Sequence, residues 1–287
     1  MEAVISPLAA SLRRLTVGGR DLVEPTDLAP GLPGMSGAML APWPNRVDGA
    51  VWWQGEHRHE LEVSEPELGN ANHGLLAGSR FDVRHSRADA VELTAAIRRP
   101  AGYPFDLDVG VTYRLHDAGI NVTTAVTNVG PAPAPVALGA HPYLRVGDAP
   151  TEVLTLTLDA SHAYRLDARH IPRERFDVTG TEWDLRGPTP VTSVPAHATF
   201  EREAATGRVV HTLSAPGGER VELSADPDYR WTQLYLAPDF PSAEGHRLAV
   251  AVEPMTAPPN ALRTGEGIHW LQPDETWRVA WGLRFVE

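Results

Sequence analysis

Residues 107–126 read LDVGVTYRLHDAGINVTTAV, and this stretch decides the fold class. Apolar or β-branched side chains occupy every second position on both sides of the segment 116–119, which reads HDAG. A period of two places alternate side chains on opposite faces of a strand, and a turn that contains glycine joins two such strands. The stretch therefore predicts an antiparallel hairpin. Its alternating residues are Leu107, Val109, Val111, Tyr113, Leu115, Ile120, Val122, Thr124 and Val126.

The same alternation recurs at residues 154–158, 209–223 and 279–285. The 25 glycines and 26 prolines are spread along the whole length, which is typical of many short strands joined by turns. The sequence has no sustained 3.6-residue apolar stripe, no repeat of fixed period and no segment that resembles a linker. It predicts an all-β fold, a large antiparallel β-sandwich, in a single domain over residues 1–287.

The composition excludes several classes of partner. A formal net charge of −12 over 287 residues disfavours binding to nucleic acid, which needs a basic surface. The acidic residues are scattered, as expected of a solvated surface. No apolar run approaches the ~20 residues that span a bilayer, and no signal peptide is evident at the N-terminus. With no cysteine in the chain, we expect a cytoplasmic protein without disulfides, acting on a small molecule as a monomer or weak dimer.

Two segments in the first quarter of the chain carry polar side chains next to turns. Residues 42–46 read PWPNR, in which the prolines stiffen the backbone before Asn45 and Arg46. A guanidinium can donate to two neighbouring hydroxyl groups at once. Residues 70–74 read NANHG, and Asn72 and His73 there could face a ligand. A surface arginine and an exposed loop histidine are the alternative interpretations of these two segments.

Two later segments place an ionisable group at the end of an apolar run. In residues 136–143, VALGAHPY, we expect His141 to emerge from a buried strand, with Pro142 fixing the backbone behind it. Its ordinary pKa of roughly 6.5 suits a proton donor, although a satisfied core histidine is the alternative. In residues 248–256, LAVAVEPMT, Glu253 ends an apolar strand. A carboxylate there is costly to desolvate unless it has a partner or a function.

These segments together resemble the aldose 1-epimerase (galactose mutarotase) family, with the look of its bacterial branch. The resemblance runs over nearly the whole chain and includes a glycine–aromatic segment as a fifth signature. Each signature is short, but the five occur in the same order over some 200 residues. They are Pro44-Asn45-Arg46, Asn72-His73-Gly74-Leu75, Gly102-Tyr103-Pro104-Phe105, His141-Pro142-Tyr143-Leu144 and Val252-Glu253-Pro254.

The resemblance implies a galactose mutarotase-like supersandwich that interconverts the anomers of a free aldohexose, such as glucose or galactose, without metal or cofactor. Glu253 matches the general base that takes the proton of the anomeric hydroxyl, and His141 matches the general acid that protonates the ring oxygen. We expect an anionic Glu253 and a protonated His141 to face each other across a gap one sugar ring wide. Arg46 and His73 match residues that hold the sugar, and the further candidates for binding it are Asn45, Asn72 and Tyr143.

One position departs from the family pattern. Family members usually carry a sugar-binding aspartate in a segment that corresponds to residues 195–200, PAHATF, where this chain has His197. A histidine forms hydrogen bonds but lacks two anionic acceptor oxygens. His197 is therefore a candidate binding residue whose presence affects the choice of substrate.

Three alternatives remain open. A hexose-6-phosphate 1-epimerase would need further cationic groups, for which Arg80, Arg98, Arg99 and Arg145 are candidates. A glycosidase or lyase would need a second carboxylate beside Glu253. A non-catalytic carbohydrate-binding protein of the same fold would not need both Glu253 and His141.

Five further side chains favour structural roles. His57 and His59 would share one face of a strand, but no third metal ligand is evident near them, and we expect a solvated hairpin rather than a metal site. Trp43, Trp231 and Tyr235 could each stack on a sugar face, but core packing is the favoured interpretation for all three.

Overall fold

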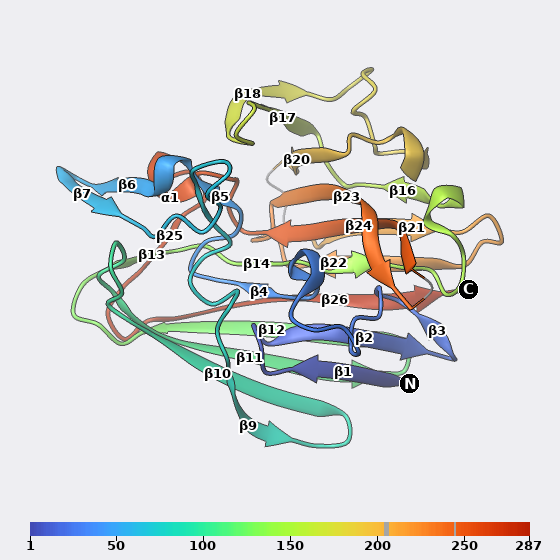
Figure 1. Cartoon of the computed structure of the whole chain (residues 1–287), viewed down its shortest axis with the longest axis horizontal. Coiled ribbons are helices and arrows are strands. Elements are labelled where there is room, and N and C mark those ends of the chain that lie inside the picture. Colours follow the sequence, from blue (N-terminus) through green and yellow to red (C-terminus); the bar gives the residue numbers. More distant parts are fainter. Residues whose placement is uncertain (204–206, 244) are drawn as a thin grey trace.

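The computed structural model describes residues 1–203, 207–243 and 245–287, and two large antiparallel sheets dominate these residues (Figure 1). In spatial order, the described part of the first sheet consists of β19 (Thr189–Pro190), β16 (Thr155–Thr157), β21 (Val209–Ser214), β22 (Arg220–Ala225), β26 (Thr276–Val286), β12 (Gly119–Asn128), β11 (Asp106–His116), β10 (Ala90–Arg98) and β9 (Asp82–Ser86).

The second sheet carries Glu253 and His197, and its strands β14 and β15 flank His141. Its longest strands, β23 and β24, form an antiparallel pair in which Gln233 lies opposite Glu253. In spatial order it consists of β18 (Pro172–Asp177), β17 (His162–Leu166), β20 (His197–Glu201), β23 (Trp231–Ser242), β24 (Gly245–Met255), β14 (Gly139–Ala140) and β4 (Met39–Leu40), while β15 (Tyr143–Leu144) also pairs with β24.

Short elements complete the described fold. The small sheets are β1 (Glu2–Ser6), β2 (Ser11–Val17) and β3 (Arg20–Asp21), then β5 (Arg46–Val47) with β8 (Ala71–Asn72), β6 (Val51–Gln54) with β7 (His57–Glu60), and β13 (Ala134–Val136) with β25 (His269–Leu271). The helical turns are η1 (Pro33–Met35), η2 (Asp48–Ala50), η3 (Thr151–Val153), η4 (Val191–Ser193) and α1 (Ala261–Thr264). No helix in the described ranges is both long and apolar enough to cross a bilayer.

The predicted all-β class is confirmed, and so is the hairpin from which it was inferred. Strands β11 and β12 pair from Leu107 opposite Asn128 to His116 opposite Gly119, so two residues form the turn. The other alternating segments form β16, β21, β22 and β26. The prediction of a single domain stays a prediction.

The main core lies between the two large sheets, and alternation along β24 separates it from the outer face. Val250 and Val252 point into the core that also holds side chains of β11 and β22. Ala249 and Ala251 point the other way, into a small cluster with Tyr143 and Phe240. Because side chains two residues apart share a face, Glu253 lies on this outer face, away from the main core.

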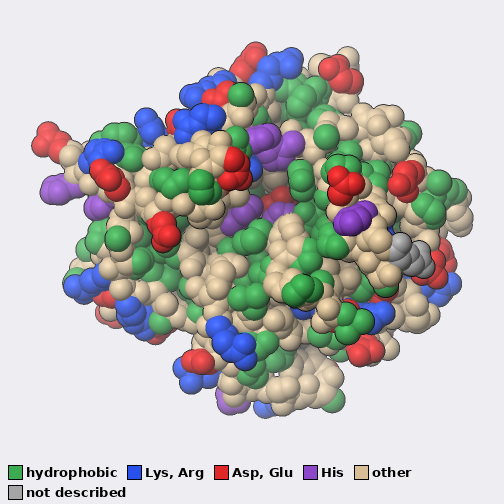
Figure 2. Space-filling model, viewed as in Figure 1, with side chains coloured by type: hydrophobic (Ala, Val, Ile, Leu, Met, Phe, Trp, Pro, Cys, Tyr) green, Lys and Arg blue, Asp and Glu red, His purple; other side chains and the backbone are tan. Residues whose placement is uncertain are grey.

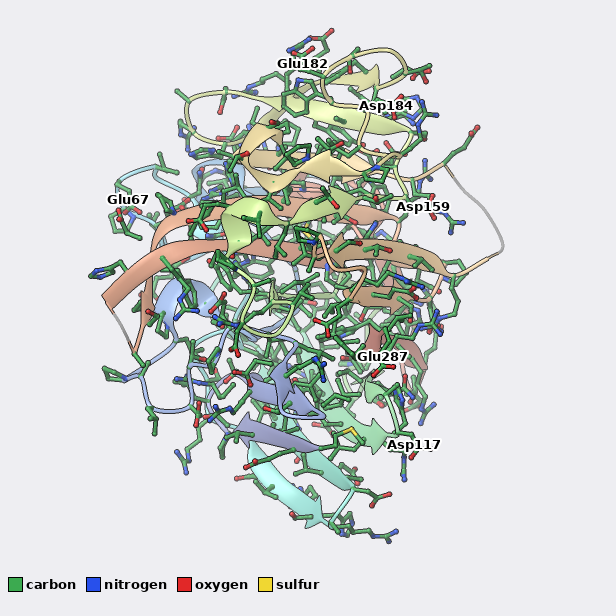
Figure 3. The ribbon with its side chains drawn as sticks, turned by 90° about the vertical axis from the view of Figure 1, so that its right-hand side faces the viewer. Glu67, Asp117, Asp159, Glu182, Asp184 and Glu287 are labelled. Carbon is green, nitrogen blue, oxygen red and sulfur yellow. The ribbon has the colours of Figure 1, made fainter. Side chains whose placement is uncertain are left out.

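Acidic side chains are distributed around the molecule, as the sequence suggests. Figure 3 labels six acidic residues, and they lie at separate places on the molecule. They are Glu67, Asp117, Asp159, Glu182, Asp184 and Glu287. Glu182 and Asp184 alone lie near each other among these six, at one end.

Candidate active site

Glu253 is a buried carboxyl group on the outer face of the second sheet. It lies near the end of β24, which continues through Pro254 to Met255, and its side chain is 2% exposed. Burial raises the pKa of Glu253 to about 8, and the nearby Arg46 guanidinium opposes that rise. Near neutral pH this group is therefore mostly protonated, which corrects the expectation of an ordinary ionised carboxylate.

His141 lies directly beside Glu253. Backbone hydrogen bonds hold its loop, because His141 N donates to Ala38 O at 3.0 Å and Gly37 N donates to His141 O at 2.8 Å. The imidazole stacks on the Tyr143 ring, with centroids 5.3 Å apart. Its Nε2 lies 3.4 Å from Oε1 of Glu253. The expected gap one sugar ring wide is therefore wrong, since the two groups lie side by side.

Burial also opposes the charge state expected for His141. The side chain is 6% exposed, and burial lowers the pKa of His141 to about 4, with Arg46 adding to the effect. The imidazole is therefore neutral at pH 7. Because burial penalises every charged form, the pair holds its one exchangeable proton on the carboxyl group rather than on the ring.

His73 forms the third side of this group. Its φ of 62° is a conformation in the left-handed region, and its backbone is tied to Asn45, since His73 N donates to Asn45 O at 2.9 Å. In return Asn45 N donates to Nδ1 of His73 at 3.3 Å. An accepting Nδ1 leaves the ring proton on Nε2. Burial, followed by the neighbouring His141, lowers the pKa of His73 well below its ordinary value.

Arg46 is fixed by an acidic partner that the sequence did not indicate. Its Nε and Nη2 donate to the two carboxylate oxygens of Glu65 at 2.8 and 2.7 Å, and both side chains are 12% exposed. Such a bidentate pair holds the guanidinium in one orientation. Asn72 lies opposite Arg46 in the pair of β5 and β8.

A buried hydrogen-bond network fixes Asn45. Its Nδ2 donates to Oε1 of Gln233 at 3.1 Å, and the Thr199 hydroxyl donates to the same oxygen at 2.7 Å. Gln233 was not among the predicted site residues. The sequence held a signal for it, because Gln233 is an amide in the mostly apolar strand 231–236. In the β23–β24 pair it shares a face with Glu253.

His197 lies at the edge of this group, next to a histidine that the sequence analysis also missed. Its Nε2 lies 3.5 Å from Nη1 of Arg46, and its Nδ1 lies 2.5 Å from Nδ1 of His170. The Tyr235 ring lies 5.7 Å from the His197 ring. Burial lowers the pKa of His197 to about 3. The structure therefore brings all eight predicted site residues into one neighbourhood.

Several polar atoms in this neighbourhood have no hydrogen-bond partner among the described residues. They are Nδ1 of His141, Oε2 of Glu253 and Oδ1 of Asn72, and all three are buried. Figure 2 shows histidine side chains gathered around a hollow near the middle of this face, with acidic atoms at its base. Buried polar atoms normally have partners, so such atoms beside a hollow point to a polar ligand.

Three ionisable side chains of this neighbourhood could also hold a cation. His73, His141 and Glu253 each place one ligand atom within 4.8 Å of the other two. Zinc sites use this combination of imidazole and carboxylate ligands. The predicted absence of a metal stays a prediction. His57 and His59 lie elsewhere, on β7, where the His59 ring stacks on Trp52 at 4.5 Å as part of a surface hairpin.

Of the three aromatic residues considered for sugar stacking, two are buried in the core and one borders the site. Trp43 is 2% exposed and packs near Tyr103 at 6.0 Å between ring centroids, so it belongs to the core. Trp231 is buried in a cluster with Tyr164. Tyr235, half-buried and close to His197, is the one that borders the site.

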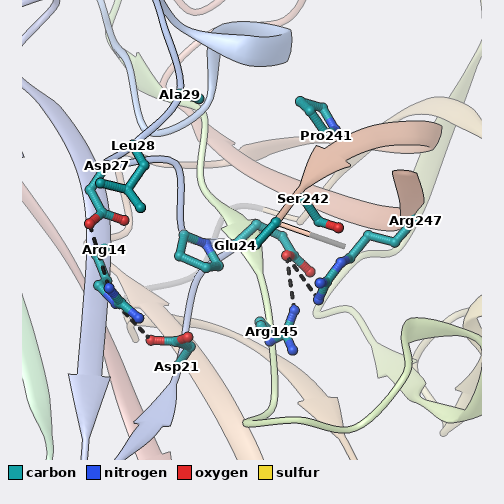
Figure 4. Close-up of a pocket in the computed structure, with 12 residues that line it drawn as sticks. Arg14, Asp21, Glu24, Asp27, Leu28, Ala29, Arg145, Pro241, Ser242 and Arg247 are labelled. Carbon is teal, nitrogen blue, oxygen red and sulfur yellow. Dashed lines mark hydrogen bonds and ion pairs between the residues drawn. The ribbon is translucent and has the colours of Figure 1, made fainter. Parts of the chain in front are cut away.

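A separate cavity of about 420 Å³ lies at the far end of the β23–β24 pair (Figure 4). Among the described residues that line it, the charged groups pair with one another, and neither His141 nor Glu253 is included. The pairs are Arg145 with Glu24 at 3.1 Å, Arg247 with Glu24 at 3.8 Å, and Arg14 with Asp21 and Asp27 at 3.4 and 3.5 Å.

Comparison with solved structures identifies the class of fold. A GalM/aldose epimerase homologue from Caenorhabditis elegans superposes with a TM-score of 0.87 at 16% identity, over 99% of this chain and 95% of that one. A galactose mutarotase-like protein from Clostridium acetobutylicum gives a TM-score of 0.84 at 18% identity, over 99% and 92%. The fold is therefore galactose mutarotase-like.

The sequence itself then assigns the family. The family model for aldose 1-epimerase matches residues 1–284, and the chain belongs to that family. A relative in Escherichia coli, the uncharacterized protein YihR, is 29% identical over 283 residues, which cover 98% of this chain and 89% of the relative.

Proposed function

We propose that this protein is an aldose 1-epimerase that interconverts the α and β anomers of a free aldohexose such as glucose or galactose. The observation that carries the proposal is the contact of 3.4 Å between Nε2 of His141 and Oε1 of Glu253, two buried groups that each retain an unpartnered polar atom among the described residues. Membership of the aldose 1-epimerase family supports an isomerase.

The side-by-side arrangement suits the chemistry of an anomeric centre. The anomeric oxygen O1 and the ring oxygen O5 are bonded to the same carbon, C1. A base that removes the O1 proton and an acid that protonates O5 must therefore act on neighbouring atoms. Two groups in contact with each other can reach both oxygens, whereas groups on opposite sides of the ring could not do so as directly.

One shared proton is sufficient for both half-reactions. The base takes the O1 proton as the C1–O5 bond breaks, C1 becomes an aldehyde, and the acid gives its proton to O5. After rotation about C1–C2, the C1–O5 bond forms again on the other face. The O5–H proton returns to the group that acted as the acid, and the carbonyl oxygen receives the proton held by the base. In the assignment that the family resemblance implies, Glu253 is the base and His141 the acid.

Either placement of the proton supports turnover. Burial in this structure favours a neutral imidazole and a protonated carboxyl group, for which His141 would be the base and Glu253 the acid. Since the reverse reaction exchanges the roles, an acid–base pair with pKa values of about 4 and 8 holds one proton across the neutral range.

Six further residues would bind and orient the sugar. Arg46 and His73 present N–H groups next to the Glu253–His141 pair. Asn45 forms hydrogen bonds with both residues and holds them in place. Asn72 offers an unpartnered Oδ1. Tyr143 would act by stacking, because its hydroxyl already donates to Gly34 O at 3.2 Å. His197 would contact the sugar at the outer edge, beside Arg46.

Polarimetry of α-glucose and α-galactose tests the proposal. Glu253→Gln should lose at least about a hundredfold in rate, the usual contribution of a general acid or base, while sugar binding persists. Glu24→Gln is the matched control, since Glu24 is also buried and burial also raises the pKa of its carboxyl, but it lies in the separate cavity. A Glu253→Gln variant that relaxes sugars as fast as the wild type would overturn the assignment.

The competing functions gain less support. Arg98 and Arg99 pair with Asp108 and Asp106 at the surface of the first sheet, and Arg145 pairs with Glu24. Arg80 is exposed. None of these four is thus presented as a phosphate ligand beside the Glu253–His141 pair. The cysteine-free sequence supports a cytoplasmic setting as part of the same proposal.

A further inference from the structure

A chain of three side chains leads outward from the site, and the first member fixes the direction of its hydrogen bonds. Nη1 of Arg46 lies 3.5 Å from Nε2 of His197. Nε and Nη2 of Arg46 are already bound to Glu65, so Nη1 is the group directed at the imidazole. A guanidinium is always charged and only donates. Nε2 of His197 must therefore be the accepting nitrogen.

The tautomer of the next ring follows from this. A neutral imidazole carries one proton, so an accepting Nε2 places the proton of His197 on Nδ1. That Nδ1 lies 2.5 Å from Nδ1 of His170 and donates to it. His170 then accepts through Nδ1 and carries its own proton on Nε2. The direction set by Arg46 is thus transmitted through two rings to an N–H on His170.

The outer end of this chain is a partly exposed ring. His170 is half-buried, whereas the side chain of His197 lies within the wall of the site. No hydrogen bond of the His170 Nε2 to any residue in the described ranges is present. The carboxylates whose charge acts on it are already bound by guanidinium groups, Glu65 by Arg46 and Asp167 by Arg173 at 2.6 Å. These pairs leave His170 presenting a donor without a competing acceptor from either.

We infer that His170 is a specificity-determining residue of the epimerase, and that its Nε2–H binds an oxyanion carried by the aldose substrate. The inference rests on the proposed epimerase activity and moves the preferred substrate from a neutral aldohexose to an aldose that carries an anionic group. A hydroxyl group both donates and accepts, but a carboxylate or phosphate oxygen only accepts, so a wall that presents a donor favours the oxyanion.

The experiment compares substrates across matched variants. Values of kcat/KM are measured by polarimetry for glucose, glucuronate and glucose 6-phosphate, and binding of each is measured by calorimetric titration. His170→Leu removes the donor, and His170→Gln restores an N–H in a similar place. His85→Leu makes the same change on the exposed strand β9, far along the other sheet.

The wild type should favour at least one oxyanion substrate over glucose. His170→Leu should lower kcat/KM for that substrate by about tenfold, through KM, which is the size of one charge-assisted hydrogen bond. Glucose turnover should stay within about twofold, and His170→Gln and His85→Leu should resemble the wild type. A response confined to glucuronate identifies a carboxylate, and one confined to glucose 6-phosphate identifies a phosphate.

Two results would overturn the inference while leaving the epimerase intact. One is a ratio of oxyanion to glucose turnover that His170→Leu does not change. The other is a wild type that prefers glucose in both assays. If no aldose is turned over, the proposed function fails, and the titration alone decides: weaker oxyanion binding by His170→Leu supports the role of His170, and unchanged binding rejects it.

Discussion

At the scale of single residues, Glu253 shows a conflict between stability and chemistry. Its side chain is 2% exposed, and burial raises its pKa to about 8. In the unfolded chain the same group has a pKa of about 4.3. The folded protein therefore holds a proton that the unfolded chain releases, and its free energy of unfolding declines as pH rises between these two values.

Replacing the carboxyl group should therefore stabilise the protein. We expect Glu253→Gln to raise the free energy of unfolding by about 2 kcal/mol at pH 7.5. The gain should be small near pH 4.5, because the unfolded chain then also holds the proton for a large part of the time. Urea unfolding of the variant and the wild type at these two pH values measures the difference. A gain that is larger at pH 4.5 than at pH 7.5 would contradict the raised pKa.

At the scale of elements, short segments with constrained backbones place the side chains of the site. Gly74 follows His73 and has a φ of 75°. A Cβ at this position would lie 2.2 Å from Ala41 O and 2.8 Å from Trp43 O, both of which are backbone atoms. The tight approach of the His73–Gly74 segment to the Ala41–Trp43 segment sets the position of His73 against the pair of β5 and β8.

Gly74→Ala should therefore lower both stability and activity. The strained φ and the clash with backbone oxygen atoms predict a loss of ~2 kcal/mol or more in the free energy of unfolding. Gly217→Ala is the control, because a Cβ there meets no atom within 4 Å and its φ is not positive. Thermal unfolding and polarimetry of both variants measure the two effects. Equal melting temperatures would show that the two segments can separate without cost.

Element by element, the sequence was most informative where a pattern repeats. The alternation in residues 107–126 and 279–285 predicted β11, β12 and β26, because a strand with one buried face imposes a period of two. The polar turn segments were found for the same reason, as interruptions of that pattern. Their order along the chain and the resemblance to a known family indicated which side chains belong together.

The contacts between distant elements could not be predicted. Glu65 and His170 lie in loops whose sequence has no periodicity, and only the fold brings them to Arg46 and His197. The proton on Glu253 depends on burial from several elements at once, so a carboxyl of ordinary pKa was the natural expectation. The same holds for its direct contact with His141.

At the scale of the whole molecule, buried histidines dominate the response to mild acid. Burial lowers the pKa of His141 to about 4 and those of His197 and His211 to about 3, and it lowers that of His73 as well. His211 is a satisfied core residue, with Asp159 N donating to its Nδ1 at 3.1 Å. All four rings are neutral in the folded state at a pH at which the unfolded chain is protonated.

Stability should therefore fall as pH drops below about 6.5, the ordinary value for histidine. The unfolded chain binds more protons between this pH and about 4, which favours unfolding. Glu253 and Glu24, whose pKa values are raised, oppose the effect. We expect a net loss of ~3 kcal/mol from pH 7 to pH 5. Urea unfolding at both values checks this, and equal or higher stability at pH 5 would contradict it.

The first large sheet ends at β9, whose sequence Asp82-Val83-Arg84-His85-Ser86 is exposed at every position. A free sheet edge exposes backbone N–H and C=O groups to any other strand. Charged side chains of both signs along such an edge must lose water before a second strand can pair with it, and that cost opposes association. The hydrated strand β9 therefore disfavours the addition of a strand from a second copy of the protein at this edge.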